Sequence, residues 1–274
     1  MILNKDAKVY VFMPARNEEK NLPVCLKNLQ NQTLLPEKIL VINDASIDNT
    51  QKICEQFKVD VITLTEQHKN YVTTPELAYK MAGVMNHAFP PPPQCGYIMQ
   101  HNPDTILPEN YIEDVILRME KTPSVIIASG CIKGEYSRRN HPRATGRIYK
   151  TWFWNKHIKR FPLNYTYETY PLLKAQSLGF EVKCFHDVKM TTLRPTKVYK
   201  ADYGYAMREL GYSFLYMLGK CVLGLPKNRS QAFKPLQSYV TSPHKLEDDD
   251  LRKFMKYYQV KQFFNAKAFL KLAG

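Results

Sequence analysis

Short apolar runs alternate with stretches of helical spacing over the first 130 residues. The apolar runs predict strands at residues 9–13, 38–43, 59–64, 97–99 and 125–128, the first of them ended by Pro14. Between them, apolar residues recur every three or four positions, which predicts helices around residues 22–29, 53–57, 77–85 and 112–119. Strands separated by helices at this spacing predict right-handed βαβ units and a mostly parallel sheet.

The pattern changes after Gly130. Residues 133–160 hold nine Lys or Arg against one acid, Glu135, and from about Asp202 the chain has helical spacing and many aromatic residues. We predict a Rossmann-like α/β domain over residues 1–200, divided into halves at 1–130 and 131–200. A helical, basic, aromatic-rich C-terminal region follows at 201–274.

Composition agrees with a folded α/β protein, since 44% of the 274 residues are hydrophobic and 23% are charged. The net charge of +14 favours anionic partners such as nucleic acid, an acidic membrane or a phosphorylated small molecule. No apolar stretch reaches about 18 residues, so no membrane-spanning helix is expected. The absence of a signal-peptide pattern predicts a cytoplasmic protein. Six widely spaced cysteines predict buried thiols rather than a zinc site.

Polar residues follow three of the predicted strands. In open parallel sheets, ligands bind outside the carboxyl ends of the strands, so these segments are the candidate site. They are Pro14-Ala15-Arg16-Asn17-Glu18, the stretch from Asn43 to Thr50, and His101-Asn102-Pro103-Asp104-Thr105.

In order and separation, these segments resemble those of family-2 glycosyltransferases of the GT-A fold. The chain has P-x-x-N-E at 14–18, N-D-A-S-I-D-N-T where the family has D-D-x-S-x-D-x-T, and N-P-D-T where it has D-x-D-T. The resemblance implies a GT-A sheet flanked by helices and transfer of a sugar from a UDP- or GDP-linked donor, with inversion.

The resemblance also implies roles for individual residues in the donor site. Asp44 would contact the nucleobase, and Asp104 would hold a Mn²⁺ or Mg²⁺ ion that bridges the diphosphate, which suits the oxygen preference of these cations. The remaining donor-binding candidates are Pro14, Ala15, Arg16, Glu18 and Asn102. Asn43 and Asn102 replace acids of the family pattern. A weaker metal site is therefore expected, and a catalytically degenerate protein of the same fold is the alternative.

Glu168 is the candidate catalytic base. It lies in Glu168-Thr169-Tyr170-Pro171-Leu172, which resembles the family's E-D-x-x-L segment with Thr169 in place of the second acid. The alternative role for Glu168 is an acid placed at a helix N-terminus, where it complements the helix dipole.

A basic segment provides candidates for acceptor binding. Guanidinium groups match phosphate oxygens bidentately, so this segment is predicted to grip an acceptor phosphate, with a solvated basic face as the alternative. The candidates are Arg138, Arg139, Arg143, Arg147 and Arg194. An acceptor glycan and a polyprenyl-phosphate lipid both remain open. The apolar residues 213–225 and the basic last helix suggest peripheral contact with an anionic membrane, with packing onto the core as the alternative.

Two other classes fit less well. A nucleotidyltransferase needs a glycine-rich loop after its first strand, where this chain has P-A-R-N-E-E. A nucleic-acid-binding protein is suggested only by the net charge, because no helix-turn-helix, zinc-knuckle or RNP-like pattern is present. No specific nucleic-acid partner is therefore expected.

Overall fold

The computed structural model describes residues 7–65, 75–195, 203–224, 233–242 and 248–272. It divides into two compact units, the first comprising Met1–Tyr71, Lys80–Phe161 and Lys174–Lys197, and the second comprising Val72–Tyr79, Pro162–Leu173 and Val198–Gly274. The boundary predicted at residue 200 lies at 196–202, outside the described residues, and stays a prediction.

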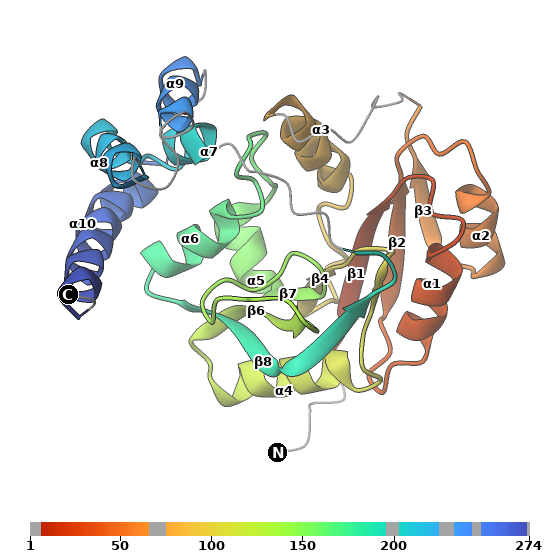
Figure 1. Cartoon of the computed structure of the whole chain (residues 1–274). Coiled ribbons are helices and arrows are strands. Elements are labelled where there is room, and N and C mark those ends of the chain that lie inside the picture. The colour runs from red at the N-terminus through yellow and green to blue at the C-terminus, as the bar shows by residue number, and fades with distance from the viewer. Residues whose placement is uncertain (1–6, 66–74, 196–202, 225–232, 243–247, 273–274) are drawn as a thin grey trace. The chain divides into compact units, whose positions relative to one another are not determined.

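The first unit contains a mixed sheet with the strand order β3-β2-β1-β4-β7-β6-β8-β5 (Figure 1). The strands are β1 (Val9–Ala15), β2 (Lys38–Asn43), β3 (Asp60–Thr63), β4 (Tyr97–Gln100), β5 (Thr105–Ile106), β6 (Val125–Ile132), β7 (Arg147–Lys150) and β8 (Glu181–Thr192). Among these described strands, four of the seven pairings are parallel, including all those of the predicted β1–β4 region. The predicted α/β fold is confirmed, and β7 introduces two of the antiparallel pairings.

The helices follow the predicted spacing in the first half of the chain. They are α1 (Leu22–Gln30), α2 (Thr50–Gln56), α3 (Pro75–Asn86), α4 (Tyr111–Lys121), α5 (Thr151–Phe153), the π-helix η1 (Trp154–Ile158), α6 (Tyr170–Ser177), α7 (Tyr203–Glu209), α8 (Phe214–Gly224), α9 (Lys234–Thr241) and α10 (Asp249–Leu272).

Strand β1 does not end at Pro14 as expected; it continues to Ala15. The pairing with β4 stops at Phe12, while Pro14 and Ala15 pair only with β2. The Phe12 carbonyl accepts a hydrogen bond from the His101 amide, just after the end of β4. Pro14, the next residue of β1 whose backbone faces β4, therefore lies beyond the end of that strand. A missing N–H is tolerated where no ladder partner exists.

Apolar side chains cover both faces of the sheet. Helices α1 and α2 lie together over β1–β3 (Figure 1), where Leu26, Leu29 and Cys54 pack with Val11 and Val41 in one buried cluster. The opposite face carries buried aromatic rings, with stacked or edge contacts among Phe12, Phe89, Tyr149, Trp154 and Phe161. All six cysteines are free and buried, as the sequence predicted.

Glu209, at the end of α7, connects segments of the second unit. This buried carboxylate accepts hydrogen bonds from the Tyr79 hydroxyl and from the Thr166 amide, both at 3.1 Å. Leu173, Leu210 and Leu251 belong to one apolar cluster of this unit. Within the described residues, no helix is both long and apolar enough to cross a lipid bilayer.

Candidate functional site

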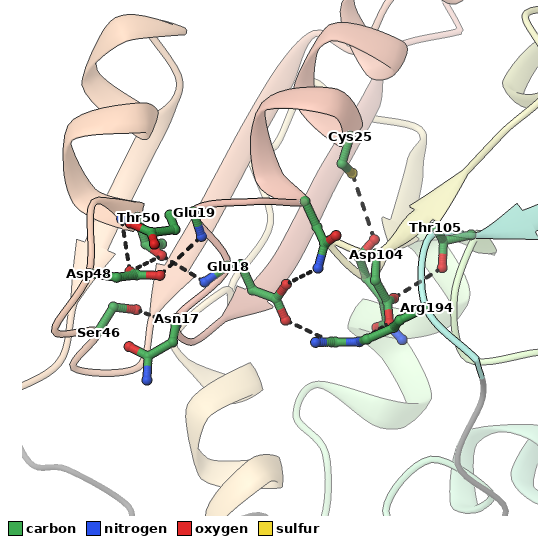
Figure 2. A network of polar contacts seen from close by, with 12 residues as sticks. Asn17, Glu18, Glu19, Cys25, Ser46, Asp48, Thr50, Asp104, Thr105 and Arg194 are labelled. Atoms are coloured by element: carbon green, nitrogen blue, oxygen red, sulfur yellow. Dashed lines mark hydrogen bonds and ion pairs between the residues drawn. The ribbon is translucent and has the colours of Figure 1, made fainter.

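Two of the predicted polar segments are fastened to each other after β1 and β2 (Figure 2). The amides of Asn17 and Glu18 donate to the hydroxyls of Ser46 (3.0 Å) and Thr50 (2.9 Å). The Ile47 amide donates to Asn17 Oδ1 at 3.0 Å in return. These loop amides have no strand partner, so side chains accept their hydrogen bonds instead. The contacts fix the shape of the loop after β1.

Asp48 provides the hydrogen bonds at the start of α2. Its Oδ1 accepts from the Thr50 amide (3.0 Å), and its Oδ2 accepts from the Glu19 amide (3.1 Å). Burial acts to raise the pKa of Asp48, but the hydrogen bonds from the Thr50 hydroxyl and from the Thr50 and Glu19 amides lower it. Because Asp48 accepts the amide of Thr50, the first residue of α2, Asp44 is not needed for that contact.

Asp44 instead faces Arg16. The Asp44 side chain is buried, and Arg16 Nη1 lies 3.8 Å from its Oδ2. The Asp44 amide donates to the Ala15 carbonyl at 2.9 Å, which continues the β1–β2 ladder by one residue. A buried carboxylate paired at the carboxyl edge of the sheet is suited to recognising a polar ligand group.

His101 and Thr145 hold the third polar segment. Asn102 donates its amide to Thr145 Oγ1 (3.2 Å), which lies 3.4 Å from His101 Nδ1, while His101 Nε2 lies 3.1 Å from the Thr105 carbonyl. Burial lowers the pKa of His101 to about 4. The imidazole is therefore neutral at pH 7. Because a carbonyl can only accept, we assign the proton to Nε2, which leaves Nδ1 to accept from Thr145.

Arg194 joins the first and third segments. Its Nε donates to Asp104 Oδ2 at 2.6 Å, and its Nη2 donates to Glu18 Oε1 at 2.7 Å (Figure 2). The antiparallel pairing of β5 with the end of β8 brings Arg194 there, because the Leu193 amide donates to the Asp104 carbonyl at 2.7 Å. The side chains of Glu18 and Asp104 thus share one cation.

Glu18 and Asp104 are the carboxylates of this site that could hold a divalent cation. Mg²⁺ and related ions bind through one or two carboxylates, with substrate phosphates completing the shell. Within the described part of the chain, no group of three or more His, Cys, Asp or Glu side chains forms a metal cage. The residues present would therefore hold a metal together with a diphosphate rather than enclose it alone.

The four arginines predicted to bind an acceptor in this region have different environments. Arg138 and Arg139, between β6 and β7, are exposed, whereas Arg143 pairs with Glu135. Arg147, the first residue of β7, is 2% exposed and donates to the carbonyls of Pro142 (2.7 Å) and Arg143 (3.0 Å). The buried guanidinium of Arg147 thus holds the preceding loop in place.

Glu168 belongs to the second unit. It lies in the turn before α6, two residues from the first helical residue, and is half-buried. The neighbouring Thr169 amide donates to the Thr166 carbonyl at 2.8 Å.

Several residues that connect the site's segments were not assigned that role from the sequence. Asn17, Ser46, Asp48 and Thr50 lie inside the quoted segments, so their motif positions were the available signal. Thr145 offered no such signal, because only the pairing of β7 with β4 places it beside Asn102.

A sheet with Rossmann-like β1–β4 order and polar groups at its carboxyl edge is an α/β architecture of the GT-A type. The family model of Glycosyl transferase family 2 matches residues 10–185. The chain therefore belongs to this family of glycosyltransferases.

Solved structures support the fold. The chain matches TarS of S. aureus with a TM-score of 0.55 and 14% identity, covering 86% of this chain and 44% of TarS. It matches the mannosyltransferase PcManGT from Pyrobaculum calidifontis, solved with GDP-Man and Mn²⁺, with a TM-score of 0.51 and 15% identity over 85% of this chain and 73% of that one. A search of curated protein sequences found no match.

Proposed function

We propose that the first unit binds a UDP- or GDP-linked sugar at the carboxyl edge of β1, β2 and β4 and supplies it for transfer to an acceptor. The observation that carries this proposal is the convergence of three polar segments: in the loop after β1, Arg16 pairs with Asp44, and Glu18 shares Arg194 with Asp104. In support, TarS has been solved with UDP and with UDP-GlcNAc, and PcManGT with GDP-Man.

Each residue has a distinct task in the proposed reaction. Asp44 accepts a hydrogen bond from the nucleobase, and Arg16 keeps that carboxylate oriented. Asp104 holds Mn²⁺ or Mg²⁺, which when bound neutralises charge on the leaving diphosphate. Pro14, Ala15, Glu18 and Asn102 shape the pocket for the ribose and diphosphate. Glu168 takes the proton of an acceptor hydroxyl, which attacks the anomeric carbon from the opposite side and inverts it.

The exposed arginines of the β6–β7 segment suit an anionic acceptor. Arg138 and Arg139 are exposed and follow Tyr136 closely in the sequence, and the Tyr136 side chain is 85% exposed. Such a surface matches a phosphate attached to an apolar or sugar group. A polyprenyl phosphate and a charged glycan share this chemistry.

Nucleotide binding tests the proposed donor site. Removing an acceptor from a buried hydrogen bond costs on the order of 1–3 kcal/mol, so Asp44→Ala should weaken UDP or GDP binding by roughly tenfold or more. Isothermal titration calorimetry with each nucleotide measures this change. Asp60→Ala is the matched control, because this exposed acid begins β3 at the opposite end of the strand from the candidate site. Equal affinity in Asp44→Ala would reassign Asp44 to a structural role.

The face of α8 supports a second proposal, namely contact with an anionic membrane. Met217 and Cys221 of this helix are buried in the second unit, whereas Leu215 is 78% exposed and Val222 is 51% exposed. Exposed apolar side chains beside basic ones such as Lys220 suit the boundary between headgroups and acyl chains. The net charge of +14 adds attraction to anionic lipid.

Vesicle binding tests the membrane proposal. Leu215→Asp replaces an apolar contact by a carboxylate, so binding to vesicles of phosphatidylcholine with phosphatidylserine should fall by about tenfold. Co-sedimentation at low salt measures this, and added salt should weaken binding of the unmodified protein because exposed charges are screened. Leu35→Asp, at an exposed position of the first unit, is the control and should bind normally. Undiminished sedimentation of Leu215→Asp would contradict the assignment.

A further inference from the structure

Arg194 holds the carboxylate oxygens that the proposed metal would need. Its guanidinium reaches across 176 residues of sequence to Glu18 and 90 to Asp104, one nitrogen to each carboxylate. The second oxygen of Glu18 already accepts from Asn21 Nδ2 at 2.8 Å. Glu18 Oε1 and Asp104 Oδ2 are therefore the oxygens turned toward a cation, and Arg194 occupies both.

The two carboxylates converge on one place, because a single guanidinium contacts both. The Cys25 thiol of α1 donates to the carbonyl of Asn102, two residues before Asp104, at 3.7 Å. Two negative groups thus share one positive group.

A guanidinium and a divalent ion cannot bind the same two oxygens together. Mg²⁺ sits about 2.0–2.1 Å from its ligands, which leaves no room for donors at hydrogen-bond distance on the same lone pairs. Arg194 is 53% exposed, so it can leave without breaking a packed core. Its release places a free guanidinium beside the metal, where diphosphate oxygens would lie.

We propose, building on the donor site proposed above, that Glu18 and Asp104 form one two-carboxylate cation site in which Arg194 is an exchangeable occupant. A divalent cation displaces the guanidinium, and Glu18 then serves as the second carboxylate in place of Asn102. Metal affinity without nucleotide is accordingly low, because the metal must replace an internal cation.

Mn²⁺ binding without nucleotide tests this exchange, measured by the loss of the free-ion signal in electron paramagnetic resonance. Arg194→Gln should bind Mn²⁺ about tenfold more tightly than the unmodified protein, and Arg194→Lys should fall between them. Adding Glu18→Gln to Arg194→Gln should remove the gain. Arg118→Gln is the matched control, because Arg118 also pairs with two carboxylates, Asp114 and Asp187, and should leave Mn²⁺ binding unchanged.

Several outcomes would overturn the exchange. These are no gain of Mn²⁺ affinity in Arg194→Gln, no Mn²⁺ binding in any variant, or a gain that persists when Glu18→Gln is added. Titration of UDP and GDP against the unmodified protein, with and without Mn²⁺, reports separately on the donor site. A failed donor site would give no nucleotide binding under either condition but leave the Mn²⁺ comparison intact, so the two failures are distinguishable.

Discussion

Replacing Asp104 with asparagine should abolish the strengthening of nucleoside diphosphate binding by Mn²⁺ and reduce sugar transfer by roughly 10²–10³-fold, the range seen when one group that stabilises transition-state charge is removed. The amide keeps the size of the side chain but lacks the negative charge that would hold a divalent ion. Arg194 would lose one of its two carboxylate partners at the same time. Titration of UDP and GDP with and without Mn²⁺ measures the binding effect.

Two variants sharpen the test of Asp104. Asp187→Asn removes an acid that is exposed and pairs with Arg118, so it should leave metal-dependent binding unchanged. Asn102→Asp restores the acid of the family pattern and should leave Mn²⁺ affinity equal or higher. Unaltered metal dependence in Asp104→Asn would remove Asp104 from the cation site, and a clear fall in Asn102→Asp would give Asn102 a separate role.

The first half of the fold follows from local pattern. The run 38–43 coincides with β2, whose apolar residues Leu40, Val41 and Ile42 are all buried, because both faces of a central parallel strand are covered. Strands β5, β7 and β8 were not predicted. The four residues of β7, Arg147–Lys150, include two basic ones, and their burial depends on antiparallel pairing with β4 and β6. Pairing between distant segments leaves no mark in local periodicity.

The candidate site, like the fold, was predictable from the sequence only where local pattern specifies it. Motif positions were sufficient to locate the segments around Asp44 and Asp104, because they follow strands that local pattern predicts. Arg194 could be named from the sequence only as a phosphate-binding candidate, since its contacts with Glu18 and Asp104 depend on the pairing of β5 with β8. Arg147 looked like its basic neighbours, yet its guanidinium is buried among loop carbonyls. Charge along a sequence does not show which cations face solvent.

Glu168 is the proposed catalytic base. A sugar hydroxyl is a weak nucleophile at neutral pH, so a carboxylate must remove its proton as the bond to the anomeric carbon forms, a contribution of typically 10²–10⁴ in rate. Its position two residues before α6 also agrees with the alternative, an acid that complements the helix dipole. A neutral substitution at Glu168 distinguishes the two roles, because loss of a base lowers the transfer rate and loss of a helix-dipole contact lowers the stability.

Glu168→Gln should reduce transfer to a hydroxyl acceptor by roughly 10²–10⁴-fold, because the amide keeps the size and hydrogen bonds of the side chain but cannot accept the proton. Affinity for UDP or GDP should barely change. Initial rates of sugar transfer, calorimetry and thermal melting measure these effects separately, with Glu181→Gln, at the exposed start of β8, as the control. A lower melting temperature with near-normal turnover would assign Glu168 to α6. A lipid-phosphate acceptor is already anionic and needs no base. If Glu168→Gln turns over normally with a lipid phosphate but not with a hydroxyl acceptor, Arg138 and Arg139 become the next residues to test.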